Sequence, residues 1–201
     1  MVLENKLNIN NQAELAKTEE KISKKKAIDL FDAKKINAIE IGTFNGLAQI
    51  HKHLFEDIYS FAGKLREVNI SKDNFRFVPT MYLKDSLKKI SQMPQKNYEQ
   101  IIQKYIEMNI AHPFREGNGR ATRIWLDLIL KQEIQQVIDW NLIEKNDYLS
   151  AMKRSVINDL ELKTLLNKGL TSEINNRELF MKGIDASYFF EGYYEFKSSE
   201  L

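Results

Sequence analysis

The chain has no cysteine, so disulfide bonds and thiol chemistry are excluded, as suits a protein of the reducing cytoplasm. Only three prolines interrupt its 201 residues, which favours an all-helical domain. It also lacks an apolar run near the roughly 18 residues of a membrane span, and its first residues lack the apolar core of a signal peptide. We therefore expect a soluble cytoplasmic protein without membrane contacts.

A large excess of charge of either sign is missing too. The 30 basic and 28 acidic residues leave a formal net charge of +2, so direct binding of nucleic acid is not expected. The short run Lys24-Lys25-Lys26 is typical of a solvated helix face. The length fits a single domain, 1–201, that buries about two-thirds of the surface of the unfolded chain.

Apolar residues recur at three- and four-residue steps along most of the chain. This spacing predicts helices over 44–61, 98–110, 119–131, 147–160 and 171–181. One segment differs, because 66–71 and 74–78 alternate polar and apolar residues around Lys72-Asp73, and Pro79 closes the pair. We expect a small β-hairpin there. An isolated hairpin is marginally stable, so it must pack on the helices or use its open edge for binding.

The most informative stretch is residues 112–123, HPFREGNGRATR, at the junction of two predicted helices. The free N–H groups of Asn118 and Gly119 at the start of the second helix, with the positive end of its dipole, form an anion site. Gly117 and Gly119 leave no Cβ to obstruct phosphate oxygens. Arg120 and Arg123 share a helix face and can bind phosphate bidentately. The stretch therefore predicts a polyphosphate site.

Two further side chains add chemistry to this site. Glu116 supplies the single carboxylate that Mg²⁺ uses when phosphates and waters fill its other positions. His112, one of three histidines, can act as a general base at neutral pH. The plainer alternatives are an Asn-Gly hairpin turn and a satisfied polar residue at a helix end, but the helical flanks argue against the hairpin. His51 and His53 are two apart on a helix, so they point in nearly opposite directions and cannot share a metal ion.

These residues resemble the Fic-domain family, whose signature is His, any residue, Phe, any residue, Asp or Glu, Gly-Asn-Gly-Arg, two residues, Arg. Every fixed position is matched by His112, Phe114, Glu116, Gly117, Asn118, Gly119, Arg120 and Arg123. The Walker A pattern of other phosphate-binding loops is absent. The hairpin over 66–79 resembles the family's flap, and the resemblance extends from about residue 10 to 165. It implies a Fic fold, a helical bundle with a small flap.

The resemblance implies an adenylyltransferase that moves AMP from ATP to a hydroxyl of a target protein. His112 would take the proton of that hydroxyl, and Glu116 would hold Mg²⁺. The 117–119 amides and Arg120 would cradle the phosphates, and Arg123 would bind the γ-phosphate. Gly119 favours AMP transfer, because a branch of the family that transfers phosphate has a bulky residue there.

The flap would bind the target through β-augmentation. The residues expected over the nucleotide are Asn69, Ile70, Ser71 and Lys72, and those expected at the adenine side are Tyr148 and Leu149. For Ile70 and Phe77, simple packing of the hairpin on the body is an equal alternative. A bacterial enzyme such as a topoisomerase would suit the small toxin-like Fic proteins as target.

The C-terminal sequence resembles the family's inhibitory motif, Ser or Thr, three residues, Glu, then Gly or Asn. Ser187 and Glu191 match it, in a helix expected over about 185–197 with Asp185 as N-cap. The resemblance implies the class with a C-terminal inhibitory helix, in which Glu191 would pair with Arg123 and block the γ-phosphate position. Tyr188 is three residues from Glu191, so we expect a docked helix to keep its hydroxyl close to the catalytic pocket. Self-modification at Tyr188 would keep the helix undocked and dissociate a repressed homo-oligomer; Tyr193 and Tyr194 are competing acceptors.

Other functions remain open at this point. The same site could transfer another nucleotide or a phosphate-bearing group, or the chain could be a non-catalytic nucleotide-binding module. It could also be a toxin-like domain held inactive by a separate antitoxin protein.

Overall fold

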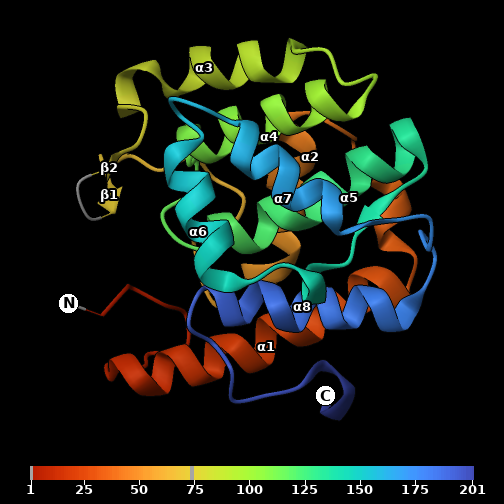
Figure 1. Cartoon of the computed structure of the whole chain (residues 1–201). Coiled ribbons are helices and arrows are strands. Elements are labelled where there is room, and N and C mark those ends of the chain that lie inside the picture. Colours follow the sequence, from red (N-terminus) through yellow and green to blue (C-terminus); the bar gives the residue numbers. More distant parts are fainter. Residues whose placement is uncertain (1, 73–74) are drawn as a thin grey trace.

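A computed structural model describes residues 2–72 and 75–201 (Figure 1). It confirms the predicted all-α architecture with a small hairpin, β1 (Ser71–Lys72) and β2 (Phe75–Arg76). The helices are α1 (Gln12–Asp32), α2 (Phe44–Phe55), α3 (Thr80–Gln92), α4 (Tyr98–Ala111), α5 (Asn118–Ile134), α6 (Lys145–Arg154), α7 (Leu160–Lys168) and α8 (Arg177–Phe190). None of the helices in these residues has the length and apolar composition needed to cross a bilayer.

Polar side chains set where several helices begin. Asn11, Thr43, Asn97 and Asn176 each accept a hydrogen bond from a backbone N–H in the first turn of the helix that follows. These bonds satisfy donors that an α-helix leaves unpaired at its start. The four caps fix the first residues of α1, α2, α4 and α8.

The core is built around α5. Across the bundle, α1 packs on α2, α2 on α5, α5 on α4 and α4 on α3. The buried apolar cluster joins residues from Leu15 in α1 to Phe190 in α8. Figure 1 shows α8 running beside α1 on the side of the molecule opposite α3. The C-terminal helix is therefore packed on the body.

Several predicted helix bounds are wrong. The helix expected over 44–61 ends at Phe55, and the next residues turn so that Ile58 and Tyr59 are buried. The helix expected over 147–160 ends at Arg154, and a separate helix, α7, begins at Leu160, whose N–H donates to the Asn158 side chain. The sequence also did not predict a short antiparallel strand pair, β3 (Val137–Ile138) with β4 (Leu170–Thr171).

The C-terminal helix differs most from its prediction. In place of the helices expected over 171–181 and 185–197, the structure has one helix, α8. Asn176 caps its start, and it ends just before Gly192, whose φ is +90°. Asp185 is not an N-cap. It lies inside α8, and its carboxylate accepts from Ser198 further along the chain.

The flap is shorter than predicted. Antiparallel pairing joins Ser71 to Arg76 and Lys72 to Phe75, so Lys72 is in a strand and not in the turn. Asp73, the other predicted turn residue, lies outside the described residues. The carbonyls of Val68 and Val78 accept from the Arg66 guanidinium, which takes the place of strand pairing at the hairpin base.

Candidate active site

The 112–123 loop is held by its own side chains. At the end of α4, His112 adopts a left-handed backbone (φ 48°), and Gly117 does so before α5 (φ 76°). Asn118 bridges the turn, because its Oδ1 accepts from Phe114 N at 2.9 Å and its Nδ2 donates to Phe114 O at 2.8 Å. A Cβ at Gly117 would lie 2.5 Å from the Phe55 ring. The loop thus requires both the amide and the glycine.

His51 supports the same loop from behind. Its Nδ1 accepts from Gly63 N at 2.9 Å, so the ring proton is on Nε2, which donates to Glu116 O at 2.8 Å. The ring stacks on Phe114 at 3.8 Å between centroids. Burial lowers the pKa of His51 to about 3, so the ring is neutral. The sequence excluded a metal site with His53 and gave no sign of this supporting role.

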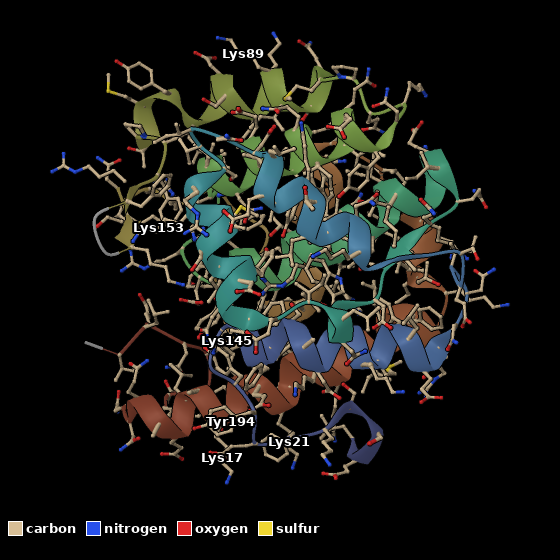
Figure 2. All side chains as sticks on the ribbon, viewed as in Figure 1. Lys17, Lys21, Lys89, Lys145, Lys153 and Tyr194 are labelled. Atoms are coloured by element: carbon tan, nitrogen blue, oxygen red, sulfur yellow. The ribbon has the colours of Figure 1, made fainter. Side chains whose placement is uncertain are left out.

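A pocket of about 740 Å³ opens beside the loop. Its lining includes most of the predicted site residues: Ile70, Ser71, Lys72, His112, Glu116, Gly117, Asn118, Gly119, Arg123, Tyr148, Leu149 and Glu191. Lys153 of α6 also lines it, on the side of the hairpin (Figure 2). Asn69 does not line it, and its Oδ1 accepts from Thr80 N at 2.9 Å. Arg120 does not line it either.

The imidazole of His112 lies flat against the ring of Phe77, with centroids 3.8 Å apart and an interplanar angle of 16°. Burial lowers the pKa of His112 to about 4, although the Glu191 carboxylate acts in the opposite direction. The ring is therefore neutral at pH 7 and can accept a proton. Phe77 therefore packs the hairpin on the body and covers one face of the His112 ring.

Glu116 fits the metal role predicted for it. Its side chain is 41% exposed, and its Oε1 accepts from Gly117 N at 2.9 Å and Arg120 Nη2 at 3.0 Å. Among the described residues, no group of three His, Asp or Glu could hold a metal by itself. A Mg²⁺ ion here would combine this one carboxylate with oxygens of phosphate and water.

Arg120 lies behind the pocket, 1% exposed. Its Nη1 donates to the buried carboxylate of Glu19 from α1, which also accepts from the Tyr59 hydroxyl. Its guanidinium also lies 4.6 Å from the ring centroid of Tyr193. With α8 docked, Arg120 therefore orients Glu116 and does not line the pocket in which it was expected to contact phosphate. Glu19 was missed because a Glu in a charged helix gives no sign of burial.

Arg123 is bound by α8. Its Nε donates to Ser187 Oγ at 2.7 Å, and its Nη2 donates to Ser187 O at 3.0 Å and to Glu191 Oε1 at 2.7 Å. A Cβ at Gly119 would come within 2.1 Å of the same Glu191 oxygen. Burial raises the pKa of Glu191, but Arg123 outweighs this and holds it at about 2. Glu191 is thus an ionised carboxylate directly over the first turn of α5.

The chain after α8 is fixed to α1. The Glu20 carboxylate accepts from the N–H groups of Glu195 and Phe196, and Lys24 donates to the Phe196 carbonyl. Lys24 also pairs with Glu20 and with Asp185, at 3.0 Å each. Glu20 and Lys24 are each 1% exposed. The segment 192–198 is therefore anchored through a buried charged cluster.

The three candidate tyrosines lie in different surroundings. Tyr188 is 1% exposed, does not line the pocket, and packs its ring beside Lys24 and Arg120. Tyr193 does line the pocket. Tyr194 is 75% exposed, and Figure 2 shows it on the α1 side of the molecule. The expectation that docking keeps Tyr188 close to the pocket is wrong, because its position in α8 directs it toward α1.

Comparisons with known proteins agree with this geometry. Residues 43–130 match the Fic/DOC family, from the start of α2 to within α5, and include the whole loop. This stretch is a Fic/DOC domain. The chain is 30% identical over 192 residues to the protein adenylyltransferase VbhT of Bartonella schoenbuchensis, covering 89% of this chain but only 39% of VbhT. It is 27% identical to the probable protein adenylyltransferase Fic of Escherichia coli, covering 88% of this chain and 91% of that protein.

Solved structures share the fold. BepC of Bartonella tribocorum, solved with AMPPNP bound, superposes with a TM-score of 0.69 at 19% identity, covering 85% of this chain and 93% of BepC. The type IV secretion system effector BepA gives a TM-score of 0.73 at 20% identity over 91% of this chain and 70% of BepA. The Fic fold predicted from the loop sequence is confirmed.

Proposed function

We propose that this chain is a protein adenylyltransferase that transfers AMP from ATP to a hydroxyl group of a target protein. The observation that carries the proposal is the position of His112. Its neutral imidazole lines the same pocket as the start of α5, where free N–H groups and the helix dipole favour phosphate. A base and an anion site in one pocket suit attack of an alcohol on a phosphate.

The reaction follows from these positions. The target's hydroxyl oxygen attacks the α-phosphorus of ATP while His112 takes the hydroxyl proton. The bond between the α-phosphorus and the bridging oxygen breaks, and pyrophosphate leaves with that electron pair. The 117–119 backbone stabilises the negative charge that grows on the phosphate oxygens. Mg²⁺ held by Glu116 would neutralise charge on the phosphates. Arg120 contributes by orienting Glu116.

The C-terminal segment inhibits this reaction in our proposal. Bound to Ser187 and Glu191, Arg123 cannot at the same time bind a γ-phosphate. The Glu191 carboxylate also lies beside Gly119, so it would repel phosphate oxygens there. We place the chain in the Fic class with a C-terminal inhibitory helix. One buried cluster from Leu15 to Phe190 supports a single unit of Fic core, flap and inhibitory helix.

We further propose that self-modification stabilises the active state. Tyr188 can accept AMP only after α8 leaves α1, because its ring is buried in the docked state. The bulk and charge of AMP would then prevent redocking. Tyr193 is the stronger competing acceptor, since it already lines the pocket. A repressed homo-oligomer and a bacterial topoisomerase as target stay predictions of the family resemblance.

A labelling experiment tests the central proposal. The Glu191→Gly variant is incubated with bacterial lysate, Mg²⁺ and ATP labelled either at the α- or at the γ-phosphate. We expect protein-bound label from the α-position alone, absent in the His112→Ala, Glu191→Gly double variant. Label from the γ-position would mean phosphate transfer, and no label from either would reject a transferase.

A further inference from the structure

Arg66 is a buried cation that neither transfer nor its inhibition explains. It precedes the hairpin and is 5% exposed. Its Nη1 donates to Val68 O at 2.8 Å and its Nη2 to Val78 O, both at the hairpin base. Its Nε donates to His112 O at 2.8 Å and its Nη2 to Ala111 O at 3.2 Å, both at the end of α4. No carboxylate among the described residues pairs with it.

Four carbonyls around one guanidinium have a clear physical basis. The oxygens of Ala111 and His112 are among those that an α-helix leaves without an internal partner at its end. A cation at this negative end of the helix dipole is favoured, and more so when it is buried. The planar fork of arginine carries five donors, so it can reach both pairs of carbonyls, whereas lysine presents three donors at one point.

The same contacts join the hairpin to the catalytic loop. The backbone N–H of Arg66 donates to Pro113 O at 2.9 Å, and that of Val78 donates to Ile110 O at 3.2 Å. Phe77, next to Val78, stacks on the imidazole of His112. A left-handed conformation is uncommon for a residue other than glycine. At His112, Arg66 is the side chain that binds the carbonyl.

We infer that Arg66 is a positioning residue for AMP transfer, which fixes the backbone of His112 and joins it rigidly to the flap. The inference rests on the proposed function. The base and a target segment bound along the flap would thereby keep one geometry relative to each other. Arg66 does not line the nucleotide pocket, so its loss should affect the transfer step and not ATP binding.

Lys104 of α4 offers a matched control. It is 1% exposed, and its Nζ donates to Ser91 O, Met93 O and Gln95 Oε1 at the end of α3, at 3.3, 3.2 and 2.7 Å. Like Arg66 it is a buried cation among carbonyls after a helix, but it binds neither the flap nor His112. Lys104→Met therefore reproduces the cost of removing a buried cation without touching the base.

The test compares Arg66→Met, Arg66→Lys and Lys104→Met in the Glu191→Gly background. A misplacement near 1 Å can cost about 100-fold in rate, so we expect that loss of kcat in Arg66→Met, with a KM for ATP within about twofold of the parent. Arg66→Lys should recover part of kcat, and Lys104→Met should keep it. A kcat retained in both Arg66 variants, or lost equally in Lys104→Met, would overturn the inference. If Arg66→Met does not fold, Arg66→Lys decides by the same criterion.

A second measurement does not depend on activity. His112 is faced by the Glu191 carboxylate, which raises its pKa, and by the cations Arg66 and Lys72, which lower it. NMR titration of His112 in the Glu191-containing protein should show a higher pKa in Arg66→Met, a smaller rise in Arg66→Lys and no change in Lys104→Met. If the Glu191→Gly parent transfers nothing, the proposed function fails, and this titration alone decides whether Arg66 governs the surroundings of His112. An unchanged pKa in Arg66→Met would then reject the inference.

Discussion

The Nη2 atom of Arg123 lies 2.7 Å from Oε1 of Glu191, and this bond joins the first turns of α5 to the end of α8. The side chain of Arg123 is 3% exposed and that of Glu191 is 23% exposed. The pair is thus largely shielded from water, unlike the exposed ion pair of Lys17 with Glu195 a few residues further along. One carboxylate both occupies the arginine and places negative charge beside the anion site.

Removing that carboxylate should release transfer. Breaking a buried ion pair costs about 3–5 kcal/mol, so even a fraction of this lost from docking should raise the transfer rate of Glu191→Gly at least about tenfold. The rate is measured as α-labelled AMP bound to target. Glu195→Gln is the matched control on the same segment and should stay near wild type, because exposed pairs contribute little. Equal rates in Glu191→Gly and wild type would remove the inhibitory role.

The base can be separated from the binding site. His112→Ala in the Glu191→Gly background should lower transfer by about 100-fold or more, because a general base contributes that much. Calorimetric titration should show ATP binding largely intact, since the imidazole moves a proton and holds no phosphate. His53→Ala is the control, because the Nε2–H of that ring donates to the Lys26 carbonyl and lies beside the Asp29 carboxylate, and neither residue lines the pocket. Transfer at the parent rate in His112→Ala would reject the proposed mechanism.

The pH dependence of kcat/KM should reveal the buried state of His112. A base acts when neutral, hence above its pKa, and burial has moved that pKa from 6.5 to about 4. The Glu191 carboxylate raises the pKa of His112, so its removal cannot move the acidic limb of the pH profile to higher pH. We therefore expect kcat/KM of Glu191→Gly to stay flat as pH falls from 8 to about 5. A fall of about tenfold near pH 5.5 would mean an ordinary, exposed histidine.

Acid should destabilise the fold through His51. Its pKa is about 3 in the folded protein and near 6.5 when unfolded, so the unfolded chain binds the extra proton between these values. The stability is complete above pH 6.5 and is lost as pH falls toward 3, by about 2 kcal/mol between pH 7 and 5. Urea unfolding at both pH values measures this. His51→Gln should be less stable than wild type at pH 7, but its free energy of unfolding should fall by about 2 kcal/mol less between pH 7 and 5. An identical fall in the two proteins would contradict a buried, neutral His51.

How much the sequence predicts depends on whether a residue acts through its neighbours in the chain. The 112–123 loop was predictable, because adjacent residues form the base, the glycine turn and the helix start. Ser187 and Glu191 were found for the same reason, one helical turn apart. Glu19, His51 and Arg66 were not, because each acts on the loop from a distant segment, and a charged or polar side chain shows no sign of burial in its own sequence.

Helix bounds failed where two signals competed. Apolar spacing continues past Phe55, yet the chain turns there because Ile58 and Tyr59 find buried places without a helix. Asp185 has the side chain of an N-cap, but Asn176 already caps α8, and burial of Met181 and Ile184 carries the helix through. Tyr188 was expected near the pocket from its spacing to Glu191, whereas its position in α8 directs it to α1.

The anchoring of the segment after α8 determines how the proposed inhibition can end. Glu191 lies between a helix packed on the body and a segment tied to Glu20, which stands 175 positions before its partner Glu195. A carboxylate held from both sides cannot drift out of place gradually; it leaves when the whole end of the chain detaches. Under the proposed inhibition the protein would exist as two populations, closed and open, and a condition would change activity by changing their ratio. Substitutions at Glu20 or Lys24 would shift that ratio without altering any residue of the pocket, so basal activity could be adjusted from the first helix of the chain.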